Sequence, residues 1–336
     1  MSDLPAGSGT GSLASVLRSG RFAVTAEIGP PRGADSEAIR RKARLLRGYV
    51  DAANVTDNQG GFTRMASLVG CVLALREGVE PVMQLTCRDR NRIALQSDLV
   101  GAAALGIPNV LLLTGDHPKF GDHPDAKPVF DLDSVQLTWT AREMRDGGRL
   151  LSGRPLVPPP RWLIGAVENP FAPPVQFRAR RLGKKIAAGA EFVQTQFVFD
   201  VAAFERWMVQ VRDLGLDQRC AILAGVGPIR TRRALRRLSH EVPGINVPED
   251  LARRLRAVPE DRMADLGADI CVETIKRLTE MPGVAGVHVM AFGFERGVPE
   301  IVQRAGVGPA CSAPPAGPPD AGESMSATAG GTDRAH

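Results

Sequence analysis

Two carboxylates stand at the ends of apolar runs, where a buried strand would give way to a loop. Glu27 lies near the end of the run 22–28, which stops at a Gly-Pro-Pro sequence, and Asp116 follows the run 109–113 and a Thr-Gly pair. In parallel α/β folds the working groups gather at the carboxyl ends of strands, so both residues are candidates for acid–base chemistry. Burial beside two prolines favours the protonated form of Glu27, which suits a general acid. The competing interpretations are that Asp116 caps the next helix and that Glu27 pairs with an arginine.

A strongly basic segment at 175–188 carries five cations at helical spacing. They form two rows, Arg178, Arg181 and Lys185 on one face and Arg180 and Lys184 on another. A row of cations beside strand ends is suited to binding a diphosphate. The competing interpretation is a solvated helix face.

The elements that position these groups repeat along the chain. Apolar runs typical of buried parallel strands begin near positions 22, 51, 80, 108, 161, 190, 219 and 284, and five of the seven intervals are 28 or 29 residues. Each interval holds a strand, a helix and two loops, and eight such units make a (β/α)₈ barrel. The alternative is a doubly wound open sheet, but the Gly-x-Gly-x-x-Gly turn it requires after the first strand is absent.

We therefore predict an α/β protein with one (β/α)₈ TIM-barrel domain at 12–304. A flexible leader is expected at 1–11, and a disordered tail at 305–336, which is rich in Gly, Pro, Ala and Ser. The carboxyl ends of all eight strands meet at one face of such a barrel. The polar side chains expected at that face are Glu27, Thr56, Thr86, Asp116, Asn169 and Gln196.

Composition excludes several classes of protein. The 336 residues are 43% hydrophobic and 24% charged, as in ordinary soluble globular proteins. The five cysteines never form a Cys-x-x-Cys pair, so we expect neither a metal site nor a disulfide framework. No apolar run approaches the ~20 residues of a membrane span, which favours a cytoplasmic protein with no membrane partner. The net charge of +5 is spread over many helices, and the single Tyr and three Trp offer little stacking surface, so no nucleic-acid partner is expected.

Five segments together resemble the methylenetetrahydrofolate reductase family. They are residues 22–31, the Thr-Cys pair at 86–87, residues 112–116, residues 184–189, and Thr-Gln-Phe-Val-Phe-Asp at 195–200. They occur in the family's order and at its spacing, over roughly residues 10–295. The resemblance implies a barrel that holds a flavin and reduces 5,10-methylenetetrahydrofolate to 5-methyltetrahydrofolate. It implies FAD, with FMN as the alternative, and NADH or another electron donor.

The resemblance also implies roles for individual residues. Glu27 would protonate N10 of the substrate and open its five-membered ring to an N5 iminium ion, and Asp116 would favour that cation. Gln196 would bind the folate together with these two carboxylates. The flavin would contact Thr56, Gln84, Thr114, Gly115, Asp116, Phe130, Asn169, Arg181, Lys184 and Lys185.

Some positions depart from the family pattern. Gln84 and Asn169 replace histidines, and Met290 and Phe294 replace a Tyr and an Arg of the last strand. The sequence is more similar to a short, divergent branch, some members of which work with a partner subunit. One alternative function is therefore a folate-binding, flavin-free or non-catalytic subunit of a redox complex. Another is a flavin barrel of the proline dehydrogenase type, which the lack of an Arg-rich last helix disfavours. The partners expected are folate, a nicotinamide or redox partner subunit, and further copies of the chain in an oligomer.

Overall fold

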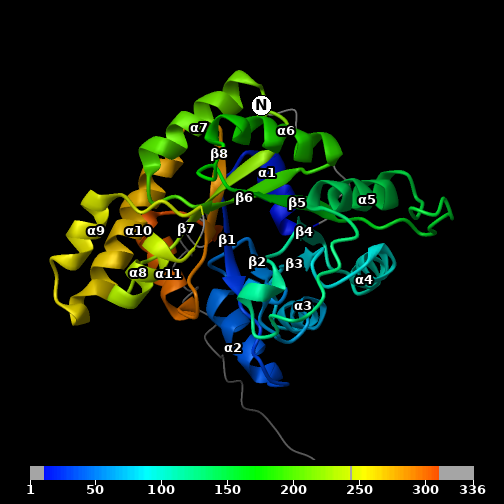
Figure 1. Ribbon diagram of the computed structural model, residues 1–336, viewed down its shortest axis with the longest axis horizontal. Coiled ribbons are helices and arrows are strands. Elements are labelled where there is room, and N and C mark those ends of the chain that lie inside the picture. The colour runs from blue at the N-terminus through cyan, green and yellow to red at the C-terminus, as the bar shows by residue number, and fades with distance from the viewer. Residues whose placement is uncertain (1–10, 243, 310–336) are drawn as a thin grey trace, which may run out of the picture.

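The computed structural model describes residues 11–242 and 244–309 and confirms the predicted closed barrel (Figure 1). Eight parallel strands pair in chain order, and β8 closes on β1. Every strand begins within two residues of its predicted start. The strands are β1 Ala23–Ile28, β2 Ala52–Val55, β3 Pro81–Thr86, β4 Asn109–Leu113, β5 Leu163–Glu168, β6 Phe192–Phe197, β7 Ala221–Val226 and β8 Val284–Val289.

The helices surround this barrel, apart from the first. They are α1 Ser12–Ser19, α2 Ser36–Leu46, α3 Ser67–Arg76, α4 Arg92–Ala104, α5 Ser134–Asp146, α6 Arg178–Ala188, α7 Val201–Asp213, α8 Arg232–His240, α9 Glu249–Arg256, α10 Met263–Thr279 and α11 Val298–Ala305. Asp35 caps α2, because its side chain accepts hydrogen bonds from two backbone N–H groups of the helix. Just before α3, the backbone N–H of Arg64 bonds to the Asn58 side chain and that of Met65 to the Pro31 carbonyl oxygen. The basic helix α6 follows a short 3₁₀ turn, Val175–Phe177.

The lower part of the barrel interior is apolar and is closed by α1. Leu13 and Leu17 of this helix join a buried cluster with inward-facing residues of seven strands, among them Leu111 and Phe192. Gly165 on β5 makes room for the ring of Phe192, since a Cβ at this position would lie 2.2 Å from the ring. The interior below the site is therefore a packed core and not a channel.

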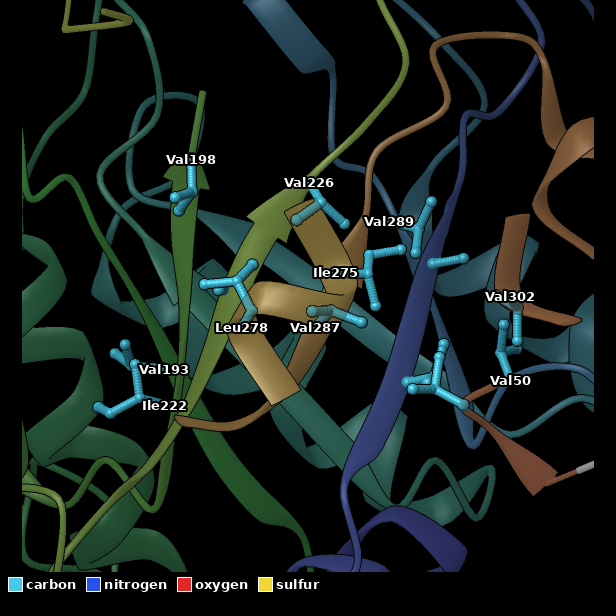
Figure 2. Close-up of a cluster of buried hydrophobic side chains, with 14 of the residues drawn as sticks. Val50, Val193, Val198, Ile222, Val226, Ile275, Leu278, Val287, Val289 and Val302 are labelled. Carbon is cyan, nitrogen blue, oxygen red and sulfur yellow. The ribbon is translucent and has the colours of Figure 1, made fainter. Parts of the chain in front are cut away.

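The outer faces of the strands pack against the surrounding helices. Figure 2 shows Val226, Val287 and Val289 of β7 and β8 near Ile275 and Leu278 of α10, and all five side chains are buried. Burial on both faces explains why the strands are continuous apolar runs instead of alternating ones.

The ordered barrel reaches beyond the boundary predicted at residue 304. Helix α11 includes Ala305, and both Ala305 and Val307 are buried in the main core cluster. The rest of the predicted tail, 310–336, and residues 1–10 of the predicted leader lie outside the described residues. Within the described ranges, no helix combines the length and the apolar composition needed to cross a membrane.

Candidate functional site

A cavity of about 420 Å³ opens at the carboxyl ends of the strands. This volume lies in the usual range for small-molecule sites. Twelve residues were predicted for the site, and nine of them line the cavity: Glu27, Gln84, Thr114, Gly115, Asp116, Asn169, Arg181, Lys185 and Gln196. The other three, Thr56, Phe130 and Lys184, do not line it.

Glu27 lies on the cavity wall near the end of β1, and its side chain is 11% exposed. Its neighbour is a histidine and not the arginine considered as an alternative: Nε2 of His288 on β8 lies 3.7 Å from Oε1 of Glu27. The other ring nitrogen of His288 lies 2.9 Å from the Thr25 hydroxyl. A carboxyl group and an imidazole at this separation can exchange a proton through small movements or one water molecule.

A buried polar layer continues from this pair across the barrel interior. The Gln194 side-chain amide donates to the Thr25 hydroxyl and to Asn54 Oδ1, both at 3.1 Å, and Asn54 donates back to Gln194. The layer therefore links β1, β2, β6 and β8, and two of its members, Gln194 and His288, themselves line the cavity. The sequence analysis missed it, although a period-two signal was available. Thr25, Gln194 and His288 each lie two residues before a cavity residue, which is Glu27, Gln196 or Met290, and alternate residues of extended chain share a face.

Asp116 follows a tight turn after β4. Gly115 has φ +86°, and a Cβ there would lie 3.0 Å from Thr86, so the turn requires glycine. The carboxyl group of Asp116 is exposed and caps no helix, because Asp133 caps α5 and His117 caps the short 3₁₀ turn. The helix-cap alternative is therefore wrong.

Arg88, which the sequence analysis also missed, lies beside this turn. Its side chain is 2% exposed, lines the cavity and donates to the Asp116 carbonyl oxygen at 3.3 Å. Burial opposes its charge, but Asp89, Asp57 and Asp116 together raise the pKa of the guanidinium. A permanent cation thus faces the same space as the two predicted carboxylates.

Asp57 ties the loops after β2 and β3 together. Its carboxylate accepts hydrogen bonds from the Thr86 backbone and hydroxyl, both at 2.9 Å, and from both terminal nitrogens of Arg90. The carboxylate is fully buried, so these charge-assisted bonds fix the cavity wall.

The two rows of cations on the basic helix α6 lie on different faces, as their spacing predicted. Arg178, Arg181 and Lys185 all line the cavity, whereas Lys184 is exposed and packs its ammonium 5.3 Å from the Phe177 ring centroid. The solvated-face interpretation is therefore wrong for the first row and right for Lys184.

The three cations that line the cavity, Arg178, Arg181 and Lys185, differ in their hydrogen-bond and ion-pair partners. Lys185 is buried and donates to Glu168 at 3.1 Å and to the Val167 carbonyl oxygen. Burial lowers the pKa of Lys185, and Glu168 opposes that shift. Arg178 donates to the carbonyl oxygens of the preceding loop and lies 3.8 Å from Glu168. Arg181 has no carboxylate partner among the described residues, which leaves it available to an anionic ligand.

The two remaining predicted residues lie outside the cavity lining for different reasons. Thr56 is 1% exposed, and its hydroxyl has no hydrogen-bond partner within the described part of the chain. Phe130 has φ +39° and packs against the apolar cluster around β3 and β4, with its ring centroid 6.3 Å from that of His117.

Comparisons with known proteins show which family the chain resembles. The family model described as methylenetetrahydrofolate reductase matches residues 12–306. A probable methylenetetrahydrofolate reductase (NADPH) of Caenorhabditis elegans is 25% identical over 84% of this chain and 42% of its own length. The 5,10-methylenetetrahydrofolate reductase of Pectobacterium carotovorum is 28% identical over 80% of this chain and 85% of its own length.

The chain thus spans about two fifths of the eukaryotic relatives and most of the bacterial ones. Among solved structures, an uncharacterised Clostridium thermocellum protein that binds two copies of 5-methyl-5,6,7,8-tetrahydrofolic acid aligns with a TM-score of 0.58. It is 14% identical and covers 87% of this chain and 96% of its own length, a likeness of fold.

Proposed function

Because the chain belongs to the methylenetetrahydrofolate reductase family, we propose that it reduces 5,10-methylenetetrahydrofolate to 5-methyltetrahydrofolate with hydride from a bound flavin. The observation that carries the proposal is Glu27, held on the cavity wall with an imidazole 3.7 Å away. The bacterial relative, covered over 85% of its length, supports the same reaction. The folate that the Clostridium protein binds belongs to the same ligand class.

The cavity has features that suit FAD, the cofactor generally used by the family. Its volume suits a fused ring system, and Gly115 lines its wall without a side chain. Gln84, Thr114 and Gly115 would contact the ring, and Arg181 would contact a phosphate group. When bound, the flavin supplies the hydride. The electron donor would be NADH or another reductant.

Glu27 would act as the general acid. In its protonated form it would donate a proton to N10 of the substrate, so that the ring opens to the N5 iminium ion. His288 would then return a proton to Glu27, because its other nitrogen is held by Thr25 and its ring faces the carboxyl group. Asp116 would stabilise the cationic iminium, and Gln196 would hydrogen-bond the pterin.

One observation favours a second candidate, a flavin-free folate-binding subunit. Of the three cations predicted to contact the flavin, Lys184 lies away from the cavity and Lys185 is already paired with Glu168. Only Arg181 remains without a carboxylate among the described residues, which leaves a weaker phosphate site than the sequence suggested.

A spectrum and a turnover assay separate the two candidates. The purified protein, with FAD added during purification, is expected to show the visible absorbance of an oxidised flavin. It should also oxidise 5-methyltetrahydrofolate with an artificial quinone acceptor. Protein that binds 5-methyltetrahydrofolate in calorimetry, but neither retains FAD nor turns over, would support the flavin-free subunit. Protein that binds no folate at all would refute both.

A further inference from the structure

A second cavity lies at the other end of the barrel, where the strands begin. Its volume is about 190 Å³, and it is lined by the end of α1, by the amino ends of β7 and β8, and by the segments that lead into β1, β7 and β8. It shares no lining residue with the candidate site. One interior cluster contains both Leu17, which lines the second cavity, and Leu111, which lines the first. A packed core therefore separates the two cavities.

Arg21 brings a guanidinium group to this cavity, and the protein uses only part of it. Nη2 of Arg21 pairs with Asp51, whose buried carboxylate also accepts from the Val24 backbone N–H at 2.8 Å. Nη1 of Arg21 is buried and has no hydrogen-bond partner among the described residues. A buried donor without an acceptor is costly, so the position favours a ligand that brings an oxygen. A carboxylate is a strong acceptor for a guanidinium.

Asp217 supplies the opposite charge from the segment before β7. Its carboxylate accepts a hydrogen bond from the Gln218 side-chain amide at 3.0 Å, and it forms no ion pair within the part of the chain that the structure describes. Gly283, which has φ +86°, lies against this carboxylate, because a Cβ there would be 3.2 Å from Oδ2 of Asp217. The carboxylate is thus placed at the entrance to β8 without a cation. An ammonium group would supply charge-assisted hydrogen bonds to it.

Most of the remaining lining is small or apolar. Leu17 of α1 and Ala221 of β7 are 5% and 3% exposed, and Ala285 of β8 lines the cavity beside them. The two alanines leave space that larger side chains would fill. A volume of about 190 Å³ is below the range of sites for drug-sized ligands, so the cavity suits a molecule with only a few carbon atoms.

We propose that this cavity binds a free α-amino acid with an apolar side chain. Its carboxylate would accept from Nη1 of Arg21, its ammonium group would donate to Asp217, and its side chain would lie against Leu17 and the two alanines. A zwitterion fits better than a simple acid or amine, because either of those would leave one of the two protein groups without a partner. The inference does not depend on the proposed function, since it concerns the other end of the barrel.

The test first compares ligands on the full chain, by ligand-observed NMR titration, which also detects weak binding. Leucine is expected to bind with a Kd of about 1 mM or lower. Two analogues each lack one charge: 4-methylpentanoate has no ammonium group, and 3-methylbutylamine has no carboxylate. Each should bind roughly 10-fold or more weakly than leucine. Affinity should also rise from alanine to valine to leucine, because a longer side chain buries more apolar surface.

Two variants then test the two polar contacts separately. Asp217→Asn keeps the side-chain volume but removes the charge, so it should weaken leucine roughly 10-fold and leave 4-methylpentanoate unchanged. Arg21→Lys keeps a cation for Asp51 but removes Nη1, so it should weaken leucine and leave 3-methylbutylamine unchanged. The matched control Asp213→Asn removes an exposed carboxylate at the end of α7, for which no ion pair is seen among the described residues. It should bind every ligand as the parent does.

Three results would overturn the inference. The first is that leucine does not bind the parent at about 10 mM. The second is that the parent binds leucine no more tightly than it binds the two analogues. The third is an Asp217→Asn variant that binds leucine as the parent does. Thermal unfolding checks that each variant is folded. If Arg21→Lys fails to fold because Asp51 loses its partner, Asp217→Asn still decides the matter, since it breaks no ion pair seen in the described ranges.

Discussion

The ion pair formed by Lys185 and Glu168 predicts that Lys185 contributes to folding stability, which a residue that only bound a phosphate would not do. Replacing Lys185 with Met removes the cation but keeps most of the side-chain volume. The Glu168 carboxylate, whose side chain is 1% exposed, would lose its partner at 3.1 Å. Removing one member of a buried pair typically costs 3–5 kcal/mol. Glu168 keeps the Asn169 N–H at 3.1 Å and Arg178 at 3.8 Å, so we expect the lower end, about 3 kcal/mol.

The assay is urea and thermal unfolding of the parent, Lys185→Met and the matched control Lys184→Met. The control removes an exposed ammonium that lies over the Phe177 ring, a contact worth about 0.5–1 kcal/mol. For Lys185→Met, about 3 kcal/mol corresponds to a fall in Tm of roughly 6–12 °C. Equal effects of the two substitutions, or a cost below about 1 kcal/mol for Lys185→Met, would refute the reasoning.

The same pair predicts how the difference between parent and variant depends on pH. Burial lowers the pKa of Lys185 below its ordinary 10.5, although Glu168 opposes the shift. Between the lowered pKa and 10.5, the unfolded chain binds more protons at this residue than the folded protein does. The contribution of Lys185 to stability therefore rises with pH across that window. The gap in unfolding free energy between parent and Lys185→Met should widen as the pH is raised through it.

Three further predictions concern the acid, its neighbour and the chain end. Glu27→Gln should keep its bound cofactor while folate reduction falls by about 10²- to 10⁴-fold, and turnover within a few-fold of the parent would remove Glu27 from the role of general acid. His288→Asn should alter the pH profile of kcat while the Kd for 5-methyltetrahydrofolate stays near that of the parent; an unchanged profile would reduce the histidine to a packing role. Truncation after residue 309 should leave Tm and activity unchanged, whereas truncation after 304 removes the buried Ala305 and Val307 and should lower Tm. Equal Tm values for the two truncations would contradict the boundary drawn here.

Much of the fold could be predicted because the strands are buried on both faces. Their apolar runs recur at the period of a β-strand and its helix, which fixed the number of units and the strand ends. Glu27, Asp116 and Gln196 reach the cavity because they lie within three residues of those ends. Helical spacing likewise separated Arg181 from Lys184, but Lys184 was predicted to contact the flavin and does not line the cavity.

The other features of the site could not be predicted from the sequence, because they depend on contacts between elements that are distant along the chain. His288 is a single histidine in an apolar strand, and only barrel closure brings β8 beside the Glu27 of β1. The pairing of Lys185 with Glu168 depends on how α6 is seated against β5, which a one-dimensional pattern does not specify. Arg88 was not predicted, because an arginine after a strand usually lies on the protein surface. Here the charges of three nearby carboxylates stabilise the buried guanidinium.

The buried polar layer formed by Thr25, Asn54, Gln194 and His288 also constrains how this barrel can be recombined. A cut between β4 and β5 divides the fold into two halves of four strands each. Asn54 and Thr25 belong to the first half, and Gln194 and His288 to the second, so the hydrogen bonds between these residues all cross the cut. A chimera that took one half from another barrel would leave buried amide or imidazole groups without hydrogen-bond partners, unless the other barrel carried matching side chains. A change at one of these four positions in one half therefore requires a matching change in the other half if the hydrogen bonds are to be kept.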